Sequence, residues 1–284
     1  MVAAINQEIW TSIEPMVKAL RLYHRHRVVG IDNLPKRGKS LLVANHSLAT
    51  YDMALLIHAI YFETGRFVRP LVDNLFYKFP FLGKFMDSVG CQAGTKENAR
   101  KLLEEKNLVL VAPGGMREAL RPSSEKYITL WDKRKGFARL AMETGTPVIL
   151  AICPRADDLY KVYPSTLTKW MYKHLKIPFF FATGMGGTPL PRPVRLVHFL
   201  SAPIRPPKMS SNPQVFEKQV ADFHAKVLKI SLDMLKNGGE SHYCLPAARA
   251  TRNLSKAKLN VDQEQEISSK KLALSGSPLW KGPN

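Results

Sequence analysis

Apolar and polar positions alternate along this chain in blocks that predict strands and helices in turn. Short apolar runs predict buried strands at residues 41–44, 67–71, 89–92, 108–111, 147–152 and 194–200. Between them, apolar residues recur at spacings of three and four and predict helices at residues 52–62, 95–105, 136–144, 166–176 and 213–236. Such alternation is typical of an α/β domain. We therefore predict a single domain with a largely parallel central sheet flanked by helices.

The same pattern divides the chain into three parts. Residues 1–27 are predicted to form an N-terminal amphipathic helix, which either packs on the core or lies in the headgroup layer of a membrane. Residues 28–244 are predicted to form the α/β domain. The periodicity fades after that, and residues 245–284 are polar and rich in Lys, Ser and Gln, which predicts a flexible tail. The segment 166–176 contains Trp170 among several lysines, and the same two interpretations, core packing or membrane contact, stay open for it.

Two stretches carry candidate chemistry, and the first follows the strand predicted at residues 41–44. That strand runs into Asn45 and His46, and Asp52 comes after a short loop. In parallel sheets ligands bind at the carboxyl ends of strands, so this imidazole is predicted to face a ligand. If Asp52 accepts a hydrogen bond from Nδ1–H, Nε2 is left free to act as a base. The alternative is a structural histidine beside a strand.

The second stretch is VLVAPGGMREAL, which follows the strand predicted at residues 108–111. A strand that opens into Gly114 and Gly115 exposes backbone N–H groups, and Arg117 adds a positive charge. This combination suits a phosphate or a developing oxyanion. The alternative is a plain glycine turn with Arg117 and Glu118 in solvent. Both stretches are predicted to line the same edge of the sheet.

Charge narrows the classes of partner. The formal net charge is +19, and residues 245–284, with seven Lys or Arg against three Asp or Glu, hold only +4 of it. A strongly basic domain attracts nucleic acid, anionic lipid headgroups or phosphorylated substrates such as coenzyme A. The sequence contains no nucleic-acid-binding motif, so we expect no nucleic acid partner. It also lacks the P-loop, the dinucleotide-binding glycine pattern and the G-x-S-x-G motif.

Cysteine usage and hydropathy indicate the cellular compartment in which the protein is expected. The three cysteines are far apart and show no metal-ligand spacing, which favours reduced thiols in the cytoplasm. No apolar segment reaches the ~20 residues of a membrane span. The N-terminus lacks the basic and apolar regions of a signal peptide. We therefore expect a cytoplasmic protein that meets membranes, if at all, from the surface.

Several motifs together resemble a known superfamily. NHSLATYD after a predicted strand resembles the His/Asp block of the glycerolipid (lysophospholipid-type) acyltransferases, and VVGIDNLPKRGKSLLVANHS is similar to the usual approach to it. APGGMREAL, KGFA and TPVILAIC resemble the later blocks in order and spacing. Within the superfamily the chain resembles the diacylglycerol acyltransferase-like branch, which includes the plant phytyl ester synthases and has P-G-G-x-R-E-A-L in place of F-P-E-G-x-R. The resemblance covers about residues 28–206.

The resemblance implies a glycerol-3-phosphate acyltransferase-like fold and a general-base mechanism. His46 would deprotonate an acceptor hydroxyl while Asp52 orients the imidazole. The alkoxide would attack an acyl thioester directly, without a covalent enzyme intermediate. Gly114, Gly115, Arg117 and Glu118 would form the substrate-binding loop. The resemblance implies acyl-CoA as co-substrate, with acyl carrier protein as the alternative donor, and no metal or further cofactor.

Two departures from the family pattern carry information. Five residues separate His46 from Asp52, where the superfamily usually has four, and Gly114 occupies the position of the Glu in E-G-x-R. In enzymes of the branch that the chain resembles the acceptor is often a neutral glyceride or alcohol, so the missing Glu favours a mono- or diacylglycerol-like acceptor over a phosphorylated one. We expect a peripheral O-acyltransferase at an anionic membrane surface. The alternatives are a lysophospholipid (lysophosphatidate-type) acyltransferase and a non-catalytic lipid-binding or membrane module.

Overall fold

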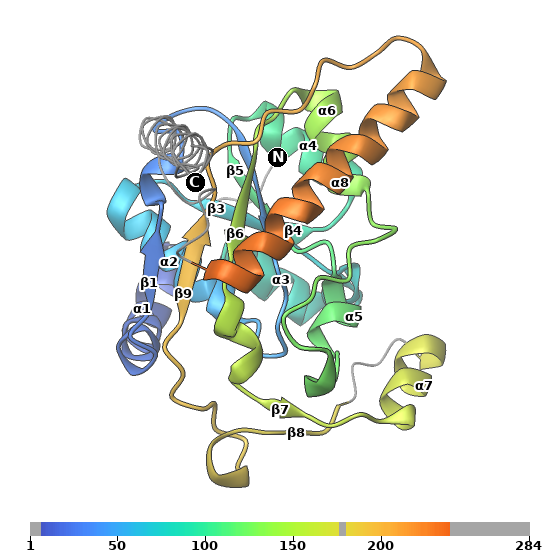
Figure 1. Ribbon diagram of the computed structural model, residues 1–284. Helices are drawn as coiled ribbons and strands as arrows, with labels where there is room; N and C mark the ends of the chain where they lie inside the picture. Colours follow the sequence, from blue (N-terminus) through green and yellow to red (C-terminus); the bar gives the residue numbers. More distant parts are fainter. Residues whose placement is uncertain (1–6, 176–179, 239–284) are drawn as a thin grey trace, which may run out of the picture. The chain divides into compact units, whose positions relative to one another are not determined.

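A computed structural model of the chain describes residues 7–175 and 180–238 (Figure 1). The chain divides into two units, Met1–Cys244 and Leu245–Asn284. The predicted flexible tail lies outside the described residues. All structural statements below concern the first unit.

Helices and strands alternate through the described part of the first unit. The strands are β1 (Arg27–Val29), β2 (Ser40–Ala44), β3 (Val68–Val72), β4 (Gln92–Ala93), β5 (Leu108–Val111), β6 (Val148–Ile152), β7 (Lys161–Val162), β8 (Ala182–Thr183) and β9 (Val197–Leu200). The α-helices are α1 (Gln7–Tyr23), α2 (Tyr51–Thr64), α3 (Pro80–Ser88), α4 (Lys96–Glu104), α5 (Gly115–Ala119), α6 (Gly136–Thr144), α7 (Thr166–Leu175) and α8 (Pro213–Asn237). Short 3₁₀ turns are η1 (Ile31–Asn33), η2 (Asn74–Lys78), η3 (Ser123–Glu125), η4 (Pro154–Asp158) and η5 (Met185–Gly187).

Helix ends follow the expected local chemistry. The hydroxyl of Thr95 accepts from the backbone N–H of Asn98 at the start of α4, 3.1 Å away. Asn212 caps α8 in the same way, accepting from the N–H groups of two residues in the first turn. At the other end of α6, Gly145 adopts the left-handed conformation that closes the helix.

Within the described residues, seven strands form one sheet in the order β1-β9-β6-β2-β5-β3-β4. The neighbours from β6 to β4 run parallel, β9 runs antiparallel to β6, and β1 is parallel to β9. The prediction of an α/β fold with a largely parallel sheet is confirmed. Strands β7 and β8 form a separate antiparallel pair below the main sheet (Figure 1).

The sheet is buried on both faces because alternate side chains of its central strands point to opposite sides. Leu41 and Val43 face α4, α6 and α8, whereas Leu42 and Ala44 face α1 and α2. Trp131 is fully buried on the first face. In Figure 1, α8 crosses the front of the sheet. These two packed faces fix the central strands, and with them the loops at the strand ends.

One face of helix α1 packs against the core of the domain. Trp10 and Val17 are buried, while Met16 and Leu22 are exposed. The structure thus shows core packing for the buried face of this helix. In the described part of the chain, no helix combines the length and hydrophobicity needed to cross a bilayer.

Candidate active site

The candidate site lies at the edge of the sheet where β2, β5 and β6 end. Because these strands are parallel, the residues that follow them meet at one edge: His46 after β2, Gly114 after β5 and Cys153 after β6. Asn45 joins two of these loops. Its side chain accepts from the N–H of Cys153 at 2.9 Å and donates to the carbonyl of Cys153 at 3.1 Å.

The ring of His46 is oriented by its own loop. Nδ1 lies 2.9 Å from the backbone carbonyl of Ser47. A carbonyl only accepts, so Nδ1 carries a proton and donates it, and in the neutral form of the ring the lone pair is on Nε2. Nε2 has no hydrogen-bond partner among the described residues. The half-buried imidazole is thus in the tautomer that a general base needs.

The backbone of His46 is held on both sides by buried charged groups. Oε1 of Glu118 accepts from the His46 N–H at 2.8 Å, and Oε2 accepts from the N–H of Leu130 at 2.9 Å. Arg121 donates to the His46 carbonyl at 3.2 Å and forms ion pairs with Glu118 and Asp157. Burial raises the pKa of the Glu118 carboxyl, and the two N–H donors and Arg121 oppose that rise.

Gly114 provides the space that the Glu118 side chain occupies. A Cβ at Gly114 would lie 1.9 Å from Oε2 of Glu118, far inside van der Waals contact. At the next position, Gly115 has a φ of 51° and its N–H is bonded to the carbonyl of Ala112 at 3.0 Å. The glycine pair therefore shapes the support beneath His46.

The four residues predicted for substrate binding thus have different surroundings. Arg117 is exposed on α5, with no acidic partner among the described residues. Glu118 is fully buried and holds His46, Gly114 is buried, and Gly115 is half-buried. Their role in binding substrate stays a prediction.

Asp52 is buried at the start of α2 and does not hydrogen-bond to His46. Its Oδ1 accepts from the hydroxyl of Ser47 at 3.3 Å, and Oδ2 lies 3.7 Å from Nε2 of His198. Ser47 thus stands between the predicted pair, because its carbonyl accepts from His46 and its hydroxyl donates to Asp52. The five-residue loop passes through Thr50, whose φ of 55° is unusual for a β-branched residue.

A row of two histidines extends from Asp52 into the protein. Nδ1 of His198 lies 2.9 Å from Nε2 of His26, and both rings are buried. Burial, followed by the charges of His198 and Arg21, lowers the pKa of His26 to about 2. His26 is therefore neutral. With its Nε2 protonated, His198 presents an N–H toward the carboxylate of Asp52.

Asp52, Cys153 and His198 are the candidate metal ligands among the described residues, with ligand atoms within 4.8 Å of one another. Burial raises the pKa of the Cys153 thiol well above its usual value, which keeps it protonated. Zinc binds thiolates. Because the thiol is protonated, we assign no metal to these three residues and describe Asp52 as a buried carboxylate with polar neighbours.

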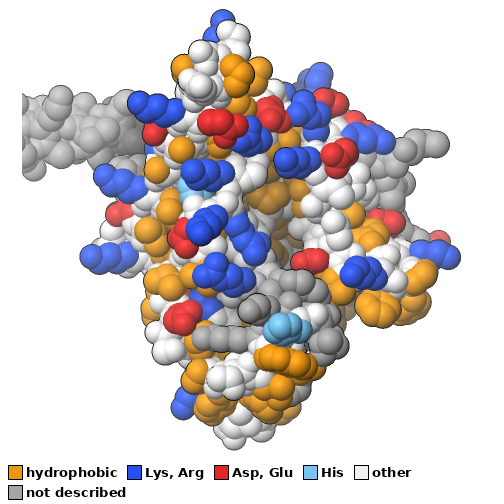
Figure 2. Space-filling view, turned by 90° about the vertical axis from the view of Figure 1, so that its right-hand side faces the viewer, with side chains coloured by type: hydrophobic (Ala, Val, Ile, Leu, Met, Phe, Trp, Pro, Cys, Tyr) orange, Lys and Arg blue, Asp and Glu red, His pale blue; other side chains and the backbone are white. Residues whose placement is uncertain are grey.

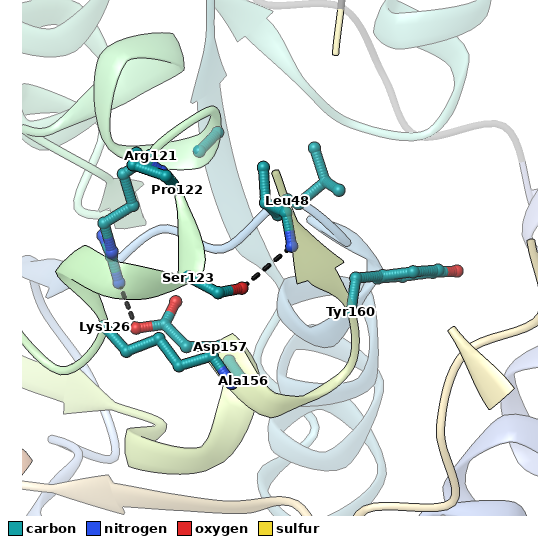
Figure 3. Close-up of a pocket in the computed structure, with 10 residues that line it drawn as sticks. Leu48, Arg121, Pro122, Ser123, Lys126, Ala156, Asp157 and Tyr160 are labelled. Atoms are coloured by element: carbon teal, nitrogen blue, oxygen red, sulfur yellow. Dashed lines mark hydrogen bonds and ion pairs between the residues drawn. The ribbon is translucent and has the colours of Figure 1, made fainter. Parts of the chain in front are cut away.

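A small cavity lies beside the loop that carries His46. It has a volume of about 10 Å³, roughly the space of one water molecule. Figure 3 shows Leu48 on one side of it and Arg121, Asp157 and Tyr160 around the rest. It is far too small for an acyl chain.

Sequence reasoning identified His46, Asp52 and Glu118 but missed three groups that position them: Ser47, Arg121 and His198. One signal was available. His198 interrupts the apolar run of β9, and a polar residue in a buried strand requires a partner. Nothing in the sequence indicated that the partner would be Asp52.

Comparisons with known proteins agree with the resemblance seen in the sequence. Residues 25–153 match the family model described as Acyltransferase. A bovine protein named "DGAT1/2-independent enzyme synthesizing storage lipids" is 28% identical over 207 residues, which is 71% of this chain and 60% of the bovine protein. The human protein of that name is 26% identical over 236 residues, 81% of this chain and 69% of its own length.

An uncharacterised protein of Mycobacterium tuberculosis is 25% identical over 189 residues, covering 65% of this chain and 52% of that protein. The chain thus spans about half to two thirds of the length of these relatives. No solved structure matches it. The predicted likeness to the acyltransferase superfamily is confirmed by the family match and by the relatives' names.

Proposed function

We propose, from the acyltransferase match of residues 25–153, that this protein transfers a fatty acyl group from acyl-CoA to the hydroxyl of a mono- or diacylglycerol-like acceptor. The observation that carries the proposal is the state of His46. Its backbone is held by Glu118 and Arg121, its Nδ1–H is bound by a carbonyl, and its Nε2 lone pair has no partner among the described residues. A base prepared in this way suits the removal of a proton from a hydroxyl.

In the proposed reaction, Nε2 of His46 takes the proton of the acceptor hydroxyl. The oxygen attacks the thioester carbonyl of acyl-CoA, forming the C–O bond of the ester. The C–S bond then breaks, and the imidazolium returns its proton to the leaving thiolate, which gives free coenzyme A. Arg117, exposed on α5, would attract the phosphates of coenzyme A.

Two observations favour a neutral acceptor. Gly114 stands where the resemblance places a Glu in phosphatidate-making enzymes, and Glu118 is buried and engaged with the backbone. The mammalian relatives are named as enzymes that synthesise storage lipids. We therefore extend a glyceride acceptor to this chain as part of the proposal.

We propose that Asp52 acts on His46 through Ser47 rather than by direct contact. Its carboxylate fixes the Ser47 hydroxyl, and the carbonyl of the same residue orients the imidazole. Asp52 is in this sense a positioning residue. Nε2 of His198 lies 3.7 Å from the other carboxylate oxygen.

The function is tested by incubating the purified chain with labelled acyl-CoA and a panel of acceptors, with His46→Ala as the comparison. We expect ester formation with mono- or diacylglycerol and a fall of about 10²- to 10⁴-fold in the variant. If lysophosphatidate is acylated far faster, the alternative lysophospholipid activity is the correct one. If no acceptor yields product, the enzyme proposal is wrong.

The role of Asp52 is tested by comparing Asp52→Asn with Ser47→Ala. If Asp52 acts through Ser47, Asp52→Asn keeps an acceptor oxygen for the hydroxyl and lowers kcat less than Ser47→Ala does, and neither variant loses more than a factor of about ten. A direct contact in the transition state predicts a different result. Loss of the charge alone then lowers kcat by as much as ~10⁴-fold, as in serine proteases, while Ser47→Ala has little effect.

A further inference from the structure

Beyond the sheet edge that carries His46, the chain forms a lobe from residues 159–175 and 180–194. Strands β7 and β8 pair at its base, α7 lies at one end and the η5 turn at the other (Figure 1). The proposed reaction does not use this lobe.

The lobe exposes large apolar side chains on a short piece of chain. Trp170 is 53% exposed and Leu190 is 58% exposed. The other large apolar side chains exposed on the lobe include Tyr163, Leu167, Phe180 and Met185. Figure 2 views the molecule from the side on which α7 lies. Hydrophobic side chains gather at the bottom of this view, below a band of Lys and Arg. Apolar groups gathered in this way mark an interaction surface.

The charge of this stretch has one sign. Residues 159–194 contain no aspartate or glutamate, whereas they contain five lysines and arginines. In the described part of the lobe, the exposed Lys161 lies 5.1 Å from the ring centre of Tyr163. A surface that combines exposed aromatic and aliphatic side chains with cations alone complements an anionic bilayer.

The lobe is attached directly to the loops that hold the base. The N–H of Val162 donates to the hydroxyl of Ser123 at 2.8 Å, two residues after Arg121, which holds the carbonyl of His46. The cavity of Figure 3 is lined both by Tyr160 of the lobe and by Leu48 of the His46 loop. At the opposite side, the hydroxyl of Tyr23 donates to the carbonyl of Pro191 at 2.8 Å.

We propose that this lobe docks on an anionic lipid bilayer, with Trp170 and its apolar neighbours inserted among the headgroups. The membrane then lies against the sheet edge that carries His46, where a lipid acceptor has the shortest route to the base. The inference rests on the proposed function only for the identity of that acceptor. Docking itself depends on the lobe alone.

Trp170 provides a reporter. Trp10 and Trp131 are buried, and Trp280, outside the described residues, is replaced by Phe in a reference variant. Vesicles of phosphatidylcholine are added with and without phosphatidylserine. We expect the emission of Trp170 to shift to the blue with phosphatidylserine, the protein to sediment with those vesicles, and both effects to weaken with added salt. Sedimentation without a shift of Trp170 would mean that another surface docks, and would overturn the proposal.

The double variant Leu167→Ala/Trp170→Ala is expected to weaken vesicle partition by about a hundredfold, since each inserted side chain contributes about tenfold or more. The matched control is Val215→Ala/Leu232→Ala on α8, where the two side chains are exposed by 46% and 41%. We expect the control to bind vesicles like the wild type. Equal loss in both pairs, or a dimer that the lobe variant dissociates, would refute docking on lipid.

Activity assays test the docking proposal separately from the proposed enzymatic function. On short-chain substrates dissolved as monomers, the lobe variant is expected to match the wild type, and on vesicle-borne acceptor it is expected to be slower. If the lobe variant loses activity on monomeric substrates as well, the lobe acts through the site and not through docking. If the wild type binds vesicles but acylates nothing, docking stands and the enzymatic proposal fails.

Discussion

Replacing Glu118 by Gln tests whether the buried carboxylate sets the position of the base. The carboxylate accepts two N–H bonds, from His46 and from Leu130, and it faces Arg121 at 3.4 Å. The amide of Gln offers one oxygen and one NH₂ group, so one of the two backbone donors loses its acceptor and meets another donor. The change is nearly isosteric, and it therefore isolates the hydrogen bonds from packing.

The size of the effect follows from these contacts. A buried N–H without a partner costs about 1–3 kcal/mol, and the weakened pairing of Arg121 adds to it, which gives about 2–4 kcal/mol. That is a large part of the ~5–15 kcal/mol that holds a domain together. We expect Tm to fall by roughly 4–16 °C. Since a displacement of ~1 Å at a reacting group costs about 10²-fold, kcat is expected to fall by about that factor.

Urea unfolding and steady-state acyl transfer measure the two effects. Glu125→Gln is the matched control, because Glu125 is exposed in η3, close to Arg121 in sequence. We expect that control to unfold and turn over like the wild type. A Glu118→Gln protein that keeps both its stability within ~0.5 kcal/mol and its full kcat would refute the idea that Glu118 holds His46.

Three further outcomes are expected. Gly114→Ala places a Cβ 1.9 Å from Oε2 of Glu118, so urea unfolding should show a loss of stability at least as large as that of Glu118→Gln, and an unchanged midpoint would contradict the geometry. His26, with its pKa lowered to about 2, stays neutral while the unfolded ring takes up a proton below pH ~6.5. The stability it contributes is therefore complete above that pH and is lost on acidification, by about 2 kcal/mol at pH 5; if His26→Gln leaves the pH slope of urea unfolding unchanged, the assignment is wrong. Arg117→Ala should raise the KM for acyl-CoA with unfolding unaffected, and an unaltered KM would exclude the proposed phosphate contact.

Much of the fold could be predicted from local pattern. The strand at residues 108–111 and the helix at 136–144 are found where the sequence places them, because their apolar spacing and end signals are unambiguous. Strand β1 was missed, since three residues with a charged start carry no periodicity. The antiparallel direction of β9 could not be predicted, because it depends on pairing with β6, some fifty residues earlier.

Of the candidate site, the sequence likewise predicted the parts that depend on local pattern and missed those that depend on contacts between distant residues. Residue types and their order identified His46 and the glycine loop, and parallel strands brought them to one edge. The sequence did not reveal that Glu118 points inward, because a charged residue on a short helix is ordinarily in solvent. Nor did it reveal the link from Asp52 to His198, which joins residues far apart in the chain.

The contacts around His46 also bear on when the site comes into being during synthesis. The histidine is synthesised before its partners. Its N–H bonds to Glu118, its neighbour Asn45 bonds to Cys153, and Asp52 lies beside His198 on β9, all of which follow later in the chain. A nascent chain that has not yet reached β9 therefore has His46 with Glu118 and Cys153, but without the contact between Asp52 and His198. The candidate site is therefore completed only after β9 has been synthesised, so an unfinished chain lacks the full arrangement around His46.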